Sequence, residues 1–205
     1  EGIIKVGSLN VAIHHHGKRR VDFEYWTDEH VRRISQKIED FDLTYKSAAK
    51  PLSDDELEFT HRIRIGLPLT DRDRFSAWRS TFNYEKLSKI LVSTTIRKID
   101  GCLEDLYGMV DDGDLRTGLL HARNVIALSV TLFNHFKGST NTKPKWQIRI
   151  LENYAKQDAT DREILTESWK LLFPDGVALR DDDLAKSEII RTIEFANEVI
   201  DYVQK

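Results

Sequence analysis

The sequence predicts an α+β protein that is mostly α-helical, with a short β-segment followed by an antiparallel helical bundle. Three observations lead to this fold class. β-Branched and aromatic residues cluster near the start of the chain, apolar residues recur at helical spacing beyond Pro51, and the 205 residues contain four prolines and ten glycines. A chain of this length can bury a sizeable core in one domain or in two.

The first elements are expected to be strands. The segments Ile3–Val6, Val11–Ile13 and Arg19–Trp26 concentrate β-branched and aromatic residues, and Gly17 and Lys18 separate the last two of them. This pattern predicts a β-hairpin or two neighbouring strands.

A helix and a linker are expected next. Thr27 is a capping residue for a helix whose apolar residues share one face: Val31, Ile34 and Ile38. The segment Asp42–Lys50 lacks periodicity and ends before a proline, which is typical of a linker. We therefore expect residues 1–50 to form a β/α domain and residues 51–205 to form the helical bundle.

Periodicity and capping residues predict the remaining helices. Ser53 and Thr160 each open a capping box with a glutamate three residues later, and Gly113 with Asp114 ends one helix and caps the next. The expected limits are Ser53–Ile65, Thr70–Trp78, Asn83–Gly113, Asp114–Gly138, Lys145–Tyr154, Thr160–Phe173 and Asp181–Gln204.

Composition narrows the classes of function. The net charge of -3 gives no overall attraction to nucleic acid, so nucleic-acid binding would require a local basic patch. A single cysteine, Cys102, excludes an internal disulfide framework, fits a reducing compartment and is expected to pack in the core. Apolar runs are too short to span a bilayer and no signal-peptide pattern opens the chain, so we expect a cytoplasmic protein.

Several segments together resemble the polymerase-β superfamily of nucleotidyltransferases. Arg20–Trp26 with the helix after it resembles a late strand of the catalytic sheet, and Glu58–Ile63 with Gly66–Leu69 resembles the helix and turn that follow. Four dipeptides resemble the HEPN-like helical domain of bacterial aminoglycoside-type members: Gly113-Asp114, Ala122-Arg123, Lys137-Gly138 and Lys145-Trp146. The resemblance covers roughly residues 18–155, and it lies in the order and spacing of these elements.

The resemblance implies Mg²⁺-assisted transfer of a nucleotide from a nucleoside triphosphate to an acceptor hydroxyl. Family members carry a Gly-Ser turn, a first pair of carboxylates and a third carboxylate on another strand. Asp22 and Glu24 share one face of a predicted strand, so both can reach one metal ion.

The assignment of these two acids within the family pattern has two readings. Gly7 and Ser8 formally satisfy the family's turn ahead of Asp22 and Glu24, but Leu9–His16 has the pattern of a strand where the family has a helix. We therefore expect Asp22 or Glu24 to correspond to the third carboxylate. The chain would then be a fragment, a separate subunit or a degenerate relative, and would not catalyse transfer alone.

A basic stretch is the second candidate site. Lys137, Lys143, Lys145 and Arg149 surround one aromatic residue, Trp146. These side chains could contact triphosphate oxygens or a nucleic-acid backbone, or they could form a solvated helix start with Trp146 packed in the bundle. The family signature implies a nucleotide- or substrate-binding role for the stretch and for Arg123.

Other readings remain open from the sequence. His14 and His16 share a strand face and could bind a metal, although a partly exposed polar edge explains them as well. Arg116 and His121 fit the Arg-x4-His spacing of HEPN ribonucleases, or an exposed arginine with a packed histidine. A non-catalytic HEPN-like module is the alternative function, acting as a homodimer or docked on a partner nucleotidyltransferase.

Overall fold

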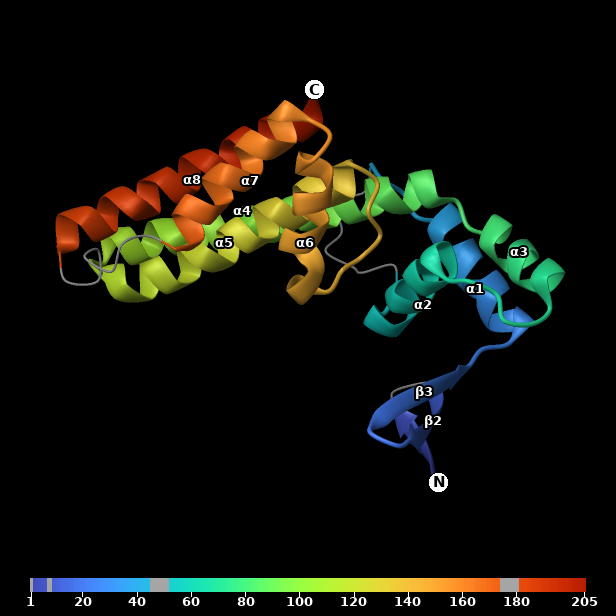
Figure 1. Cartoon of the computed structure of the whole chain (residues 1–205). Coiled ribbons are helices and arrows are strands. Elements are labelled where there is room, and N and C mark those ends of the chain that lie inside the picture. The colour runs from blue at the N-terminus through green and yellow to red at the C-terminus, as the bar shows by residue number, and fades with distance from the viewer. Residues whose placement is uncertain (1, 7–8, 45–51, 174–180) are drawn as a thin grey trace. The chain divides into compact units, whose positions relative to one another are not determined.

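The computed structural model describes residues 2–6, 9–44, 52–173 and 181–205, in which three strands precede eight helices (Figure 1). The predicted fold class, α+β and mostly α, is confirmed. Contacts divide the chain into two compact units, Glu1–Phe41 with Pro51–Asn83 and Asp42–Lys50 with Tyr84–Lys205. The Gly7-Ser8 turn and most of the predicted linker lie outside the described residues.

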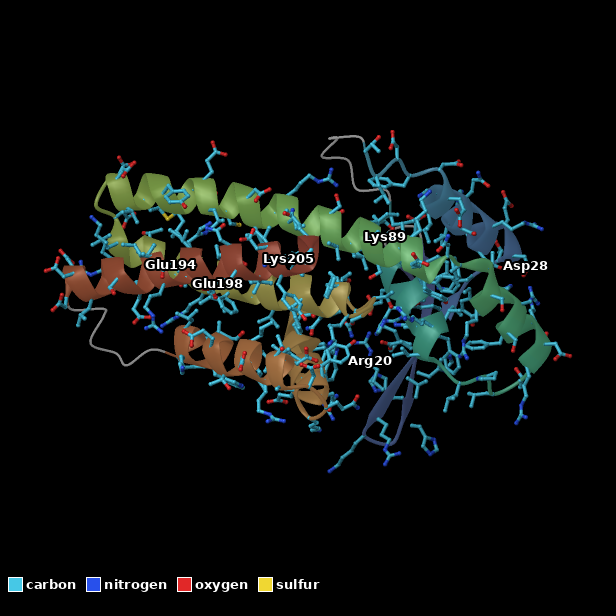
Figure 2. All side chains as sticks on the ribbon, turned by 90° about the horizontal axis from the view of Figure 1, so that it is seen from above. Arg20, Asp28, Lys89, Glu194, Glu198 and Lys205 are labelled. Carbon is cyan, nitrogen blue, oxygen red and sulfur yellow. The ribbon has the colours of Figure 1, made fainter. Side chains whose placement is uncertain are left out.

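The first unit begins with a three-stranded antiparallel sheet in the order β1-β2-β3, formed by Gly2–Val6, Leu9–His16 and Arg19–Tyr25. The predicted hairpin is confirmed, with Gly17 and Lys18 as its turn. Gly17 has φ of 59°, a backbone conformation that favours glycine. Arg20 on β3 is labelled among the side chains in Figure 2.

Three helices complete the first unit: α1 (Asp28–Glu39), α2 (Asp54–Ile65) and α3 (Arg72–Thr81). Thr27 and Ser53 cap the first two as predicted, and each forms a capping box. Asp28, labelled in Figure 2, opens α1 and accepts a hydrogen bond from Trp78 Nε1 at 2.6 Å. The buried apolar side chains of this unit come from β2, α1, α2 and the residues that flank α2 and α3: Val11, Ala12, Val31, Ile34, Ile38, Leu52, Phe59, Ile63 and Phe82.

The second unit is a bundle of five helices within the described residues: α4 (Tyr84–Asp111), α5 (Leu115–Phe136), α6 (Pro144–Ala155), α7 (Ala159–Leu172) and α8 (Asp182–Gln204). Helices α4 and α5 form an antiparallel hairpin, α8 packs along α5, and α6 crosses the others (Figure 1). Their shared core contains Ile99, Ile126, Phe133 and Ile189, and Cys102 packs against it as expected. No helix in the described ranges has the length and apolar character needed to cross a membrane.

Two helix starts differ from the prediction. Asp71 caps α3 in place of Thr70, with φ of 44° and its side chain accepting from the backbone N–H of Arg74. Asp158 caps α7 in place of Thr160, and accepts from two backbone N–H groups of the first turn. In both cases a nearby aspartate takes the position, because its carboxylate is an equally good acceptor.

The division between the units also differs from the expected limit. We expected the β/α domain to end at residue 50, whereas α2 and α3 group with the sheet and α1. Ser35 Oγ donates to the carbonyl of Thr81 at 2.8 Å, and Lys37 pairs with Glu56 at 2.7 Å. These contacts join α1 to elements beyond the predicted linker.

Candidate functional site

The two predicted carboxylates lie on one face of β3. Asp22 is opposite Ile13 and Glu24 is opposite Val11 on β2, in adjacent positions of the same ladder face. The side chain of Asp22 is 44% exposed and that of Glu24 is 22% exposed. The predicted arrangement of two acids side by side on a strand is therefore present, at a solvent-accessible surface.

Each carboxylate has a guanidinium partner. Arg20 Nε donates to Asp22 Oδ1 at 2.7 Å. Arg62 Nη1 donates to Glu24 Oε1, and Trp26 Nε1 donates to Glu24 Oε2 at 3.3 Å. Each acid of the pair is thus paired with an arginine, one on the same strand and one on α2.

Arg62 joins two acids from different elements. Its Nη2 donates to Glu58, one turn earlier on α2, while its Nη1 donates to Glu24. Burial acts to lower the pKa of Arg62, but the hydrogen bonds and negative charges of Glu24 and Glu58 outweigh it and raise the pKa. The guanidinium therefore stays charged and positions Glu24.

Aromatic packing fixes the end of β3 against α2. The ring of Trp26 stacks on Phe59, with centroids 4.1 Å apart and planes at 25°. Phe59 also makes edge-to-face contacts with Trp78 and Phe82. Because Trp26 lies two residues after Glu24, this cluster limits the movement of the acid pair.

His15 lies on the ladder face of the two acids, across from Arg20, whereas His14 and His16 lie on the opposite face of the sheet. His14 is opposite Val21 and His16 is opposite Arg19, on the ladder face that carries Phe23. The ring of His14 contacts Phe23 edge-on, with centroids 5.2 Å apart. A metal site combining His14 and His16 with Asp22 is therefore not formed. Across the described ranges, no group of three or more His, Cys, Asp or Glu side chains is placed to hold a metal ion.

Three members of the basic stretch lie together on α6. Lys145 Nζ lies 5.5 Å and the guanidinium of Arg149 lies 5.8 Å from the ring of Trp146, which is 40% exposed. The interpretation of Trp146 as a packed core residue is wrong. Lys143 is the N-cap residue of the same helix. The structure thus presents an exposed aromatic ring flanked by two cations.

The other two predicted binding residues lie elsewhere. Lys137 Nζ pairs at 3.1 Å with Asp161, whose side chain is 2% exposed. Burial acts to lower the pKa of Lys137, but the hydrogen bond and charge of Asp161 outweigh it and raise the pKa. Arg123 is exposed on α5, fourteen residues before Lys137, about 21 Å along the helix axis. Neither joins the cations around Trp146.

A buried amide network, which was not predicted from the sequence, supports the start of α6. Asn134 Nδ2 donates to the backbone carbonyl and to Oε1 of Gln147, both at 2.9 Å. Gln147 Nε2 donates to the carbonyls of Asn141 and Lys143. Asn134 Oδ1 is buried and has no hydrogen-bond partner within the described residues. The signal available in the sequence was a polar Asn134 directly after the apolar Leu132 and Phe133.

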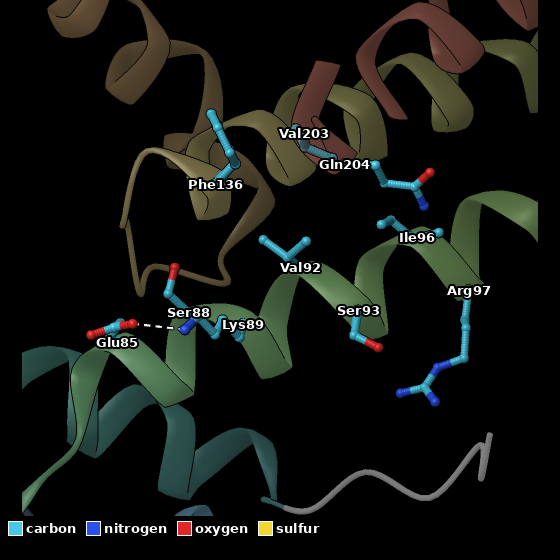
Figure 3. A pocket seen from close by; sticks show the side chains of 10 residues that line it. All are labelled: Glu85, Ser88, Lys89, Val92, Ser93, Ile96, Arg97, Phe136, Val203 and Gln204. Carbon is cyan, nitrogen blue, oxygen red and sulfur yellow. Dashed lines mark hydrogen bonds and ion pairs between the residues drawn. The ribbon is translucent and has the colours of Figure 1, made fainter. Parts of the chain in front are cut away.

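A cavity of about 530 Å³ opens between α4, the end of α5 and the end of α8 (Figure 3). Apolar side chains from all three helices face it: Val92, Ile96, Phe136 and Val203. Lys89 at its margin pairs with Glu85 at 2.7 Å. The cavity contains none of the predicted site residues.

Arg116 and His121, which fit the Arg-x4-His spacing of HEPN ribonucleases, do not form a joint site. Arg116 and His121 are five residues apart on α5, which places them about 140° apart around the helix. Arg116 is exposed, whereas His121 Nε2 is buried 4.0 Å from Asp105 of α4. Their placement gives no support to a shared phosphate site.

Comparison with known proteins adds no relative. No protein family, curated protein or solved structure matches this chain.

Proposed function

We propose that this chain is a nucleotidyltransferase-like protein in which Asp22 and Glu24 bind Mg²⁺ together with a nucleoside triphosphate. The observation that carries the proposal is the placement of two carboxylates and two guanidiniums together, Asp22 with Arg20 and Glu24 with Arg62. A metal–triphosphate complex contains both positive and negative groups. A surface that offers both kinds of partner complements it.

The donor set is suited to magnesium. Mg²⁺ is commonly bound through one or two carboxylates together with waters and substrate phosphates, and Asp22 and Glu24 supply two oxygen-bearing groups on one strand face. When bound, the ion neutralises charge on the phosphates. Three-ligand clusters are absent from the described residues. We therefore propose that further carboxylates come from a partner subunit and that this chain alone does not complete transfer.

Arg20 and Arg62 have a second role in this proposal. Once the carboxylates bind the metal ion, each guanidinium loses its pairing with Asp22 or Glu24 and can donate to phosphate oxygens. The two arginines thus hold the acids in place before binding and contribute to phosphate binding afterwards.

The surface on α6 is proposed to bind the nucleotide or the acceptor. Trp146 offers a ring face for stacking, and Lys145 and Arg149 beside it offer cations for anionic groups. Lys143 belongs to the same helix start, which the Asn134–Gln147 network supports. Lys137 and Arg123 are left out of this surface because of their positions.

Calorimetry of triphosphate binding tests the proposal. Wild-type protein is titrated with ATP, GTP, CTP and UTP in turn, with and without Mg²⁺. We expect Mg²⁺-dependent binding of at least one triphosphate, weakened about tenfold or more in Asp22→Asn and in Glu24→Gln. Glu29→Gln, an exposed acid in the first turn of α1, is the matched control and should bind as wild type does. Absence of Mg²⁺-dependent binding in the wild-type protein would contradict the proposal.

A second candidate is a non-catalytic HEPN-like module that docks on a partner nucleotidyltransferase. The observation that favours it is the engagement of both carboxylates in ion pairs without a third acid beside them in the described ranges. A pull-down compared between wild type and Asp22→Asn addresses it. Enrichment of one nucleotidyltransferase by both proteins supports this candidate, and enrichment by neither counts against it.

A further inference from the structure

Strand β3 lies at an edge of its sheet and exposes apolar side chains. β3 pairs with β2 on one side, and no strand in the described residues pairs with its other side. Val21, Phe23 and Tyr25 occupy every second position of β3 and so share one face. Their exposed fractions are 42%, 49% and 56%. Unpaired backbone groups beside exposed apolar side chains form a template for a further strand.

The apolar face of β3 is only partly covered, although Ala12 of β2 on the same face is buried. On the ladder face of Phe23, strand β2 contributes Ala12 and His14. Small sheets gain independent stability from a packed apolar face, and the apolar side chains of β3 remain about half exposed. Pairing with another chain would supply both missing backbone partners and apolar contact.

The order of charges along β3 and the turn residue just before it identifies the partner. Lys18, Arg19 and Arg20 precede Val21, and the acids Asp22 and Glu24 follow it. One half of the segment is therefore basic and the other half is acidic. An antiparallel copy of the same segment presents these halves in reverse order, so the strand is complementary to itself.

One register satisfies this complementarity at four of the five charged positions, all except Arg19. With Val21 opposite itself, Arg20 lies opposite the partner's Asp22, Lys18 opposite the partner's Glu24, and Arg19 opposite the partner's Phe23. If the two-fold axis passed through Asp22 instead of Val21, two copies of Asp22 would lie opposite each other, which is repulsive. Charges on an edge strand usually discourage pairing, but here they repel only in the wrong register.

We propose that two copies of this chain associate through antiparallel pairing of their β3 edges, with Val21 on the two-fold axis. The result is one continuous six-stranded sheet with four cross-strand ion pairs, in which each residue contact occurs twice except that of Val21 with its own copy on the axis. This interface goes beyond the proposed function although it uses Arg20, Asp22 and Glu24 of the proposed triphosphate site, and its test requires neither a nucleotide nor a metal ion.

Site-directed crosslinking tests the register. Val21→Cys and Phe23→Cys are compared under mild oxidation in a Cys102→Ala background, so that each protein has one thiol. Opposed residues of antiparallel strands lie within disulfide reach, so Val21→Cys should form a covalent dimer. Phe23→Cys has similar exposure and is the matched control. Its two copies are four residues out of register, about 13 Å apart, and it should stay monomeric.

Sedimentation equilibrium tests the charge pattern. The mass of wild-type protein should rise with concentration toward twice the 23.8 kDa of one chain. Arg20→Glu should remain monomeric, and the double variant Arg20→Glu/Asp22→Arg should dimerise again because the opposite signs are restored. Far-UV circular dichroism checks that all three are folded. A wild-type monomer at every concentration, or equal crosslinking of Val21→Cys and Phe23→Cys, overturns the proposal.

Discussion

Arg62 of α2 donates a hydrogen bond to the carboxylate of Glu24 on β3, across 38 positions of the sequence. This contact is the polar counterpart of the stacking between Trp26 and Phe59. Together they attach the sheet to the helices of the first unit, and they differ in how much each should contribute to stability.

Replacement of Phe59 should be costly. The side chain is 4% exposed and contacts three other aromatic rings, so Phe59→Ala is expected to lower the free energy of unfolding by about 3–5 kcal/mol. Urea unfolding followed by near-UV circular dichroism measures it. Phe173→Ala is the control, because Phe173 is 68% exposed and its loss should change stability by about 0.5 kcal/mol or less. Equal unfolding midpoints for the two variants would contradict the packing described.

Replacement of Arg62 should have a smaller effect. Its side chain is 49% exposed, and solvent screening limits exposed ion pairs to about 0–1 kcal/mol. We expect Arg62→Gln to lower the free energy of unfolding within that range in the same urea experiment. Arg72→Gln, an exposed arginine in the first turn of α3, serves as control. A loss as large as that of Phe59→Ala would show that the ion pair contributes more than its exposure allows.

The Lys137–Asp161 pair should stabilise the fold at neutral pH and lose this effect at alkaline pH. The folded-state pKa of Lys137 is raised above its ordinary 10.5, so its contribution is fully present below about pH 10.5 and is lost as the pH rises through the raised value. Lys137→Met leaves the carboxylate of Asp161 buried without its cation and should cost about 1–3 kcal/mol at neutral pH.

Thermal unfolding of wild type and Lys137→Met, measured from pH 7 to pH 11, checks this dependence. The difference in stability between the two proteins should shrink above pH 10.5. Lys186→Met, an exposed lysine on α8, should show no such change. A difference that stays constant across the whole range would rule out the assigned role of Lys137.

A close contact between α5 and α8 predicts a paired substitution. A Cβ atom on Gly118 would lie 2.8 Å from Ile189 Cδ1, and Ile189 is fully buried. Gly118→Ala is therefore expected to destabilise the bundle by about 1–3 kcal/mol through overpacking, despite the better helix propensity of alanine. Ile189→Val removes Cδ1, so the double variant should be more stable than the sum of the single effects predicts. Strict additivity in urea unfolding would count against this contact.

Local signals predicted local structure well and long-range contacts poorly. The caps at Thr27 and Ser53 and the turn at Gly17 follow from hydrogen-bonding and φ preferences within a few residues. Thr70 and Asp71 compete for one capping position, and the choice depends on the backbone that Asp71 adopts. The division at residue 83 depends on contacts between distant segments, which periodicity does not encode.

The candidate site shows the same contrast. The two-residue spacing of Asp22 and Glu24 was sufficient to place both acids on one face of β3. The pairing of Glu24 with Arg62 was not predictable, because it requires knowledge of where α2 packs. The exposure of Trp146 depends in the same way on the packing of α6.

The amides of Asn134 and Gln147 limit how α6 can be aligned with α5. Asn134 has two acceptors on Gln147, and Gln147 in turn binds two carbonyls of the preceding loop. A displacement of α6 by one helical turn would separate these donors and acceptors in a region that water does not reach, at a cost of several kcal/mol. Apolar neighbours can exchange for one another with little change, whereas this pair permits a single alignment and keeps the ring of Trp146 directed outward.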